Sequence, residues 1–169
     1  MSEGKQISRK EIAKRIADVE RVTSQIDWKN NDCLPRAVAF THGILPDSHE
    51  LGLHARAFVY QAIEASQTLA DRNGEIAEVA KFVVDDREKT KKIIDKNLSK
   101  SDKAWLAFGD EKHSHVLGIL KLDQDEYLVA NLSSDDPYLT MNVDQITNHL
   151  TEYSKYTELG ACIIGFRKK

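Results

Sequence analysis

The sequence predicts an α+β fold in which helices come first along the chain and an antiparallel sheet follows. In roughly the first hundred residues, apolar side chains recur at the three- and four-residue spacing of helices. From Lys103 onward they form short runs that are separated by turn residues, as strands do. Elements grouped in this way are typical of folds whose helices pack as a separate layer on the sheet.

The N-terminal part of the chain is predicted to be helical only. Ser8 and Glu11 form a capping box that starts the first helix, Gly43 is suited to end the second, and the polar turn at residues 71–74 stops the third. Asp85 and Asp86 are expected to divide the fourth into two pieces. The predicted helices cover residues 8–25, 33–42, 46–69 and 75–98.

The C-terminal part is predicted to supply the sheet. A turn at residues 123–125 joins two apolar runs into a hairpin, and Asn142 is a good cap for a helix over residues 143–149. Cys162 lies in the middle of the last apolar run, so we expect it to be a core residue. The predicted strands cover residues 104–108, 115–122, 127–132, 138–141 and 159–166.

Length and charge restrict the class of protein. With 169 residues, the chain is expected to form one domain over residues 8–169, preceded by a disordered segment, residues 1–7. Its net charge of −3, with acids and bases interspersed, argues against a nucleic-acid partner, which would need a concentrated basic face.

The compartment is predicted to be a reducing cytoplasm. No apolar stretch approaches membrane-spanning length, and the polar N-terminus lacks the apolar core of a cleaved signal. Two cysteines are too few for a disulfide framework, so a free thiol is expected at each. Secretion as an effector without a cleaved signal stays open, and the oligomeric state cannot be read from the sequence.

Cys33 is the candidate nucleophile. It follows a run of short polar residues at a predicted helix start, where Asp32 is a suitable N-cap and Pro35 falls in the first turn. The positive end of the helix dipole favours the thiolate, which is the form that attacks carbonyl carbon.

His115 and Asn131 are expected to complete a triad. His115 opens one apolar run and Asn131 ends the next, so pairing of the two runs as a hairpin would bring them to the same end. His115 would act as base and later as acid, and the amide oxygen of Asn131 would orient its imidazole.

Alternatives exist for each supporting role. His113 is the rival base, two residues from His115, and Asn30 is a rival orienter, with Asp135 as a further candidate. Asn30 and Asn31 are expected to supply an oxyanion donor beside the backbone N–H of Cys33. No metal and no cofactor are predicted for this chemistry.

The segment around Cys33 resembles the nucleophile motif of ovarian-tumour (OTU) type deubiquitinases, which belong to the papain-like cysteine peptidases. The similarity lies in NDCL at residues 31–34, RAVA at residues 36–39 and HARAFVY at residues 54–60. The chain departs from that family at Asn30, where Asp is usual, and at Pro35, where an aromatic residue is usual. From His115 onward, its order is more similar to bacterial papain-fold effectors, which include peptidases and glutamine deamidases.

The resemblance implies a papain-like thiol hydrolase that acts on a protein substrate. A peptidase or deubiquitinase is the first expectation, with ubiquitin or a ubiquitin-like protein as the substrate that the OTU similarity implies. A glutamine deamidase of the same fold is an alternative, because the same thioester chemistry serves both. A protein-binding module in which Cys33 is incidental is the alternative from another class.

Overall fold

The structure is a computed structural model of the chain, and it describes residues 8–25, 33–43, 59–109, 114–130, 138–154 and 160–169. Two predictions made from the sequence concern residues outside these ranges. The disorder expected for residues 1–7 and the first half of the helix expected over residues 46–69 lie outside the described residues.

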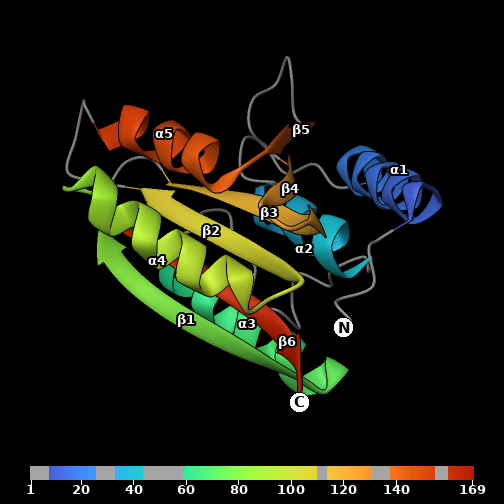
Figure 1. The fold of residues 1–169 in the computed structure, drawn as a ribbon. Helices are drawn as coiled ribbons and strands as arrows, with labels where there is room; N and C mark the ends of the chain where they lie inside the picture. Colours follow the sequence, from blue (N-terminus) through green and yellow to red (C-terminus); the bar gives the residue numbers. More distant parts are fainter. Residues whose placement is uncertain (1–7, 26–32, 44–58, 110–113, 131–137, 155–159) are drawn as a thin grey trace.

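The described residues form five helices and six strands (Figure 1). The helices are α1 (Arg9–Gln25), α2 (Cys33–His42), α3 (Val59–Asn73), α4 (Arg87–Ser99) and α5 (Val143–Ser154). The strands are β1 (Glu75–Val83), β2 (Lys103–Gly109), β3 (Ser114–Asp123), β4 (Glu126–Ala130), β5 (Tyr138–Met141) and β6 (Gly160–Lys168).

All six strands belong to one antiparallel sheet in the order β1-β6-β2-β3-β4-β5. The last strand of the chain, β6, therefore lies between β1 and β2. The strands from β2 to β5 are each paired with the next along the sequence. The sheet thus joins a local meander, β2 to β5, to two distant pairings, those of β6 with β1 and with β2.

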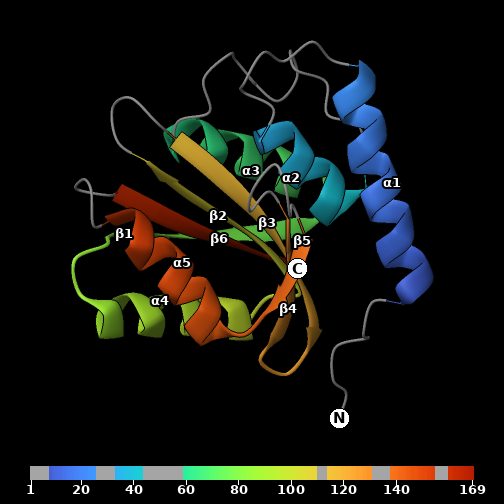
Figure 2. The ribbon, with the colours of Figure 1, turned by 90° about the horizontal axis from the view of Figure 1, so that it is seen from above.

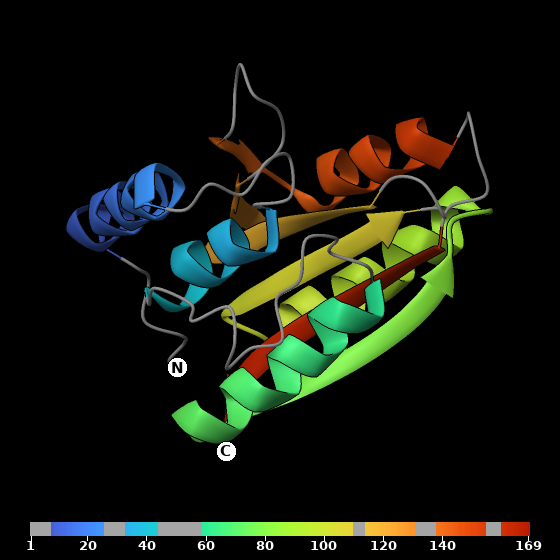
Figure 3. The same ribbon diagram turned by 180° about the vertical axis from the view of Figure 1, so that it is seen from behind.

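Helices cover both faces of the sheet (Figures 2 and 3). On one face, α2 and α3 pack against the side chains of alternate sheet residues, which include Trp105, Ala107, Val116, Cys162 and Ile164. On the other face, α4 and α5 pack against the intervening residues, which include Leu106, Phe108, Leu117, Ile119 and Ile163. This alternation follows from the two-residue period of a strand.

Helix α1 lies outside α2 and extends the first layer. Val19 of α1 is buried in a cluster with Phe40 of α2 and Leu120 of β3. Ser8 caps α1, because its hydroxyl oxygen accepts a hydrogen bond from the backbone N–H of Glu11 at 3.1 Å. The predicted start of this helix is confirmed.

Most of the elements expected after residue 85 are confirmed. Asp86 caps α4 by accepting from the backbone N–H groups of Glu88 and Lys89, and the β3–β4 hairpin and β5 occur where they were predicted. The start of α5 is a reciprocal capping box. Asn142 accepts from the N–H of Gln145, whose side chain accepts from the N–H of Asn142.

The prediction of a helix over residues 75–83 is wrong, because this segment is strand β1. Ala77 and Val79 pack toward α3, whereas Ala80 and Phe82 pack toward α4. A strand covered on both faces shows no alternation of apolar and polar residues, so its spacing can imitate that of a helix. The class α+β is confirmed, but the expectation that residues before 100 are helical throughout is not.

Candidate functional site

Helix α2 begins at Cys33 and is oriented along the sheet by contacts of its later turns. Near its C-terminal end, the Thr41 hydroxyl accepts a hydrogen bond from the indole N–H of Trp105 at 2.8 Å. One turn earlier, Ala37 packs in a cluster with Val116. Going from Thr41 back to Ala37 thus leads toward the start of β3. The Cys33 end of α2 therefore points to the end of the sheet where β2 ends and β3 begins (Figure 2).

Gly118 lets α2 lie close to β3. A Cβ atom at this position would be 3.1 Å from Cδ2 of Phe40 and 3.3 Å from Cα of Ala37. The second of these atoms belongs to the backbone of α2, which cannot turn away as a flexible side chain can. The absence of a side chain at Gly118 therefore sets the distance between the cysteine helix and the sheet.

The β3–β4 hairpin occurs where the sequence predicted it. Gly118 pairs with Ala130, the last residue of β4, and the two strands are joined by a turn at Gln124 and Asp125. The start of β3, where His115 is the second residue, therefore lies at the same end of the hairpin as the end of β4.

The side chain of His115 lies on the face of the sheet opposite to α2. His115 alternates with Leu117 and Ile119, which are buried against α4 and α5. Its ring meets that of Phe108 edge-on, with centroids 5.8 Å apart, and its charge acts on His149 of α5. The structure thus brings Cys33 and His115 to one end of the sheet without placing the His115 imidazole on the α2 face.

Asn30, Asn31, His113, Asn131 and Asp135 lie outside the described residues, as does the side chain of Cys33. The triad of Cys33, His115 and Asn131 therefore stays a prediction, and so does the role of Asn30 and Asn31 at an oxyanion site.

Cys162 is a core thiol, as predicted. It is a free cysteine and is fully buried in β6, which lies between β1 and β2 and pairs with both. Burial raises the pKa of the Cys162 thiol to about 11, although the charge of Lys81 and a hydrogen bond from the backbone of Ala107 partly oppose the rise. At neutral pH such a thiol is almost fully protonated, which makes it a poor nucleophile.

A buried polar cluster that the sequence did not predict lies at the C-terminal end of α2. The His42 side chain is 1% exposed, and both of its ring nitrogens have a partner. Its Nδ1 lies 2.8 Å from the hydroxyl oxygen of Thr41, and its Nε2 lies 3.1 Å from Oε1 of Glu75 in β1. The rings of Trp105 and Phe166 meet the imidazole edge-on.

The cluster extends into the sheet on both sides of His42. Nζ of Lys103 in β2 forms an ion pair with the second carboxylate oxygen of Glu75 at 2.9 Å. On the other side, the Thr41 hydroxyl lies 2.7 Å from the backbone carbonyl of Ala37, in addition to its bond with Trp105. These contacts tie the last turn of α2 to β1 and β2.

Burial governs the ionisation of this cluster. Burial lowers the pKa of His42 to about 4, and the charge of Lys103 acts in the same direction, against the bond to Glu75. Burial also opposes ionisation of Glu75, but the hydrogen bonds from His42 and Lys103 outweigh it, so the pKa of Glu75 is lowered. At neutral pH, the cluster holds a neutral imidazole beside a carboxylate–ammonium pair.

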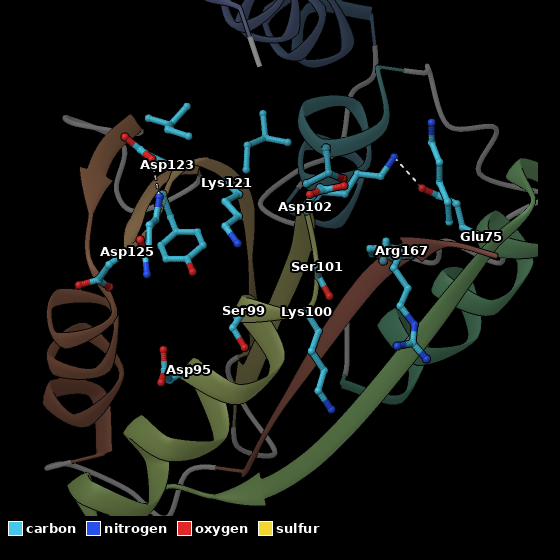
Figure 4. A pocket seen from close by; sticks show the side chains of 18 of the residues that line it. Glu75, Asp95, Ser99, Lys100, Ser101, Asp102, Lys121, Asp123, Asp125 and Arg167 are labelled. Carbon is cyan, nitrogen blue, oxygen red and sulfur yellow. Dashed lines mark hydrogen bonds and ion pairs between the residues drawn. The ribbon is translucent and has the colours of Figure 1, made fainter. Parts of the chain in front are cut away.

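A pocket of about 1220 Å³ opens next to this cluster (Figure 4). Arg15, Thr41, Glu75, Lys103 and Phe166 contribute to its lining. Other parts of the wall carry charges of both signs, from Lys100, Lys121 and Arg167 and from Asp95, Asp123 and Asp125. The pocket lies at the end of the sheet away from Cys33, and Thr41, Glu75 and Lys103 of the buried cluster form part of its wall.

Neither a metal site nor a membrane-spanning helix is found in the described part of the chain. Within it, no three His, Cys, Asp or Glu side chains are grouped in a way that could hold a metal ion. None of the helices described is both long enough and apolar enough to span a bilayer.

The chain matches no protein-family model, and no curated protein is similar enough in sequence to count as a match.

Proposed function

We propose that the chain is a thiol hydrolase of papain-like architecture that acts on a protein substrate, with Cys33 as its nucleophile. The observation that carries the proposal is the position of α2. This helix begins at Cys33, packs on an antiparallel sheet, and directs its N-terminal end to the start of β3. A cysteine in that position has the helix dipole to favour its thiolate.

The chemistry follows the ordinary course of thiol hydrolases. The Cys33 thiolate adds to a carboxamide or peptide carbonyl, and a histidine gives its proton to the departing amine, which leaves a thioester. Water, deprotonated by the same histidine, then cleaves the thioester and restores the thiol. On a peptide or isopeptide bond this is a peptidase or deubiquitinase, and on a glutamine side chain it is a deamidase.

His115 and His113 are the two candidates for this histidine. His115 lies at the same end of the sheet as the start of α2, but its ring contacts Phe108 on the face opposite to α2. The His115 side chain would therefore have to turn around the start of β3 to reach Cys33. His113 precedes β3 in the sequence and lies outside the described residues. Asn131 or Asn30 would orient the imidazole, and Asn30 and Asn31 would serve the oxyanion. The buried free thiol of Cys162 suits a reducing compartment such as the cytoplasm.

A thiol-reactive probe tests the proposal. At neutral pH we expect Cys33 to react about tenfold or more faster than free cysteine, because a thiolate stabilised by a helix start and a histidine is mostly ionised. Cys33→Ser should abolish the labelling. His115→Ala and His113→Ala are a matched pair, and the variant that loses the rate enhancement identifies the base.

A non-catalytic protein-binding module is the second candidate, and the orientation of His115 on the α5 face favours it. This candidate predicts labelling of Cys33 no faster than free cysteine and no effect of either histidine substitution. If labelling is fast, incubation with ubiquitin chains and with glutamine-containing proteins separates cleavage, seen as smaller fragments, from deamidation, seen as a mass change without cleavage.

A further inference from the structure

The cluster at the C-terminal end of α2 contains one hydroxyl proton that two acceptors compete for. The Thr41 oxygen lies within hydrogen-bond distance of three groups: the Trp105 indole N–H, the Ala37 carbonyl and His42 Nδ1. The indole can only donate and the carbonyl can only accept. The Thr41 hydroxyl proton can therefore point to Ala37 or to His42, but not to both.

The protonation state of His42 decides between them. When His42 is neutral and its Nε2–H donates to Glu75, Nδ1 is an acceptor and must receive the Thr41 proton. The donors then run in one direction, from Trp105 through Thr41 and His42 to Glu75. The Ala37 carbonyl then gives up the hydrogen bond from the Thr41 hydroxyl, but it keeps the ordinary helical hydrogen bond from the backbone N–H four residues later.

When His42 is protonated, both of its nitrogens donate. Nδ1–H then donates to the Thr41 oxygen, and the Thr41 hydroxyl turns to Ala37. The Thr41–His42 hydrogen bond is thus reversed in direction while every group keeps a partner. Because both arrangements are complete, the cluster has two discrete states.

We infer that the Trp105–Thr41–His42–Glu75 chain is a proton-operated device, in which protonation of His42 reverses the Thr41–His42 hydrogen bond and loosens the hold of the sheet on α2. The loosening has an electrostatic cause. The charged groups that act on His42 are Glu75 of β1, Lys103 of β2 and Arg15 of α1. A protonated His42 would be a buried cation near the partly exposed Lys103, and these two positive charges exceed the single negative charge of Glu75.

The pocket beside the cluster gives the proton its route. Thr41, Glu75 and Lys103 all contribute to the pocket wall, so water can reach the cluster although the imidazole itself is buried. The inference does not depend on the proposed hydrolase activity, because protonation of His42 would change the packing of α2 on the sheet whatever the role of Cys33.

The test is a titration of the intact, ¹⁵N-labelled chain followed by NMR between about pH 2.5 and pH 8. At neutral pH we expect the His42 imidazole to be the Nε2–H tautomer, and to become doubly protonated only well below the range of an exposed histidine. The Trp105 indole N–H resonance should shift with the same midpoint, since its acceptor Thr41 changes its other bond at that point.

Variants separate a proton-operated chain from a merely structural cluster. Lys103→Met should move the His42 midpoint to higher pH and Glu75→Gln should move it to lower pH, because they remove opposite charges. Thr41→Val should uncouple the Trp105 resonance from His42, whereas Thr41→Ser should preserve the coupling. Lys100 is an exposed lysine of the same pocket, so Lys100→Met is the control. It should change neither the His42 midpoint nor the coupling of the Trp105 resonance to it.

The inference is overturned if His42 titrates like a solvent-exposed histidine. It is equally overturned if the Trp105 resonance does not follow the His42 midpoint in the unmodified chain, or if Lys103→Met and Glu75→Gln shift that midpoint in the same direction. None of these measurements uses enzymatic activity, so a failure here is distinct from a failure of the proposed function.

Discussion

Cys162 shows how strongly its surroundings decide what a cysteine does. It lies fully buried in β6, and burial raises the pKa of its thiol to about 11. Both its access to reagents and its thiolate fraction are therefore low. In the Cys33→Ser variant, where Cys162 is the remaining cysteine, we expect almost no reaction with a thiol reagent at neutral pH under native conditions.

The control is the same variant in denaturant, where Cys162 should react at the rate of an ordinary thiol. The measurement is the amount of label per chain against time. Rapid labelling of the native variant would mean that β6 opens readily and that the packing of Cys162 between β1 and β2 does not persist in solution.

At the scale of elements, the contact between α2 and β3 depends on one glycine. A side chain at Gly118 would meet the ring of Phe40 and the backbone of Ala37. Gly118→Val should therefore force α2 away from the sheet and lower the free energy of unfolding by about 1–3 kcal/mol, the usual range for an overpacked contact. The change is measured by urea unfolding.

Gly160→Val is a matched control, because a Cβ atom there would find only the carbonyl oxygen of Gly109 at 3.9 Å, an ordinary contact. Its unfolding free energy should be much closer to that of the unmodified chain. If Gly118→Val were tolerated as well as Gly160→Val, the close approach of α2 to β3 would be wrong. The proposed position of Cys33 would lose its support with it.

Elements with local causes were predictable from the sequence, and β1 was not. The β3–β4 hairpin has its turn residues between its two strands, and α5 has its capping box in Asn142 and Gln145. Strand β1 pairs with β6, about half the chain away, and is covered by helices on both faces. Nothing within residues 75–83 records that distant partner, so local spacing favoured a helix.

The candidate site also combines features that neighbouring residues determine with one that depends on distant contacts. The start of a helix at Cys33 and its end at Gly43 follow from neighbouring residues, and Gly43 has the positive φ of +67° that suits a glycine at a helix end. The face on which His115 lies depends on which side of β3 receives α2. That choice is made by Gly118 and its contacts, which residues near His115 do not reveal.

The His42 cluster escaped prediction for a related reason. Thr41 and His42 end one helix, Glu75 begins β1 and Trp105 belongs to β2, so the partners meet only when the sheet has formed. With residues 75–83 expected to be helical, the sequence offered no reason to bring Glu75 to His42.

At the scale of the whole molecule, the burial of His42 makes stability depend on pH. A base whose pKa is lowered in the folded state binds its proton first in the unfolded chain, so falling pH favours unfolding. The contribution of His42 is complete above its ordinary pKa of 6.5 and is lost as the pH falls toward about 4. Burial lowers the pKa of His149 as well, which acts in the same direction, and the lowered pKa of Glu75 extends the loss to more acidic pH.

The gap between 6.5 and about 4 means that about 3 kcal/mol of the unfolding free energy present at neutral pH is lost on acidification through His42. Urea unfolding of the unmodified chain should therefore show lower stability at about pH 4.5 than at pH 7. His42→Gln has no imidazole to protonate, so although it is less stable at pH 7, it should lose much less on acidification. His149→Gln, which leaves the cluster intact, should keep most of the pH dependence. An equal loss in the unmodified chain and in His42→Gln would contradict the assignment, because the proton uptake that drives acid unfolding would then belong to another group.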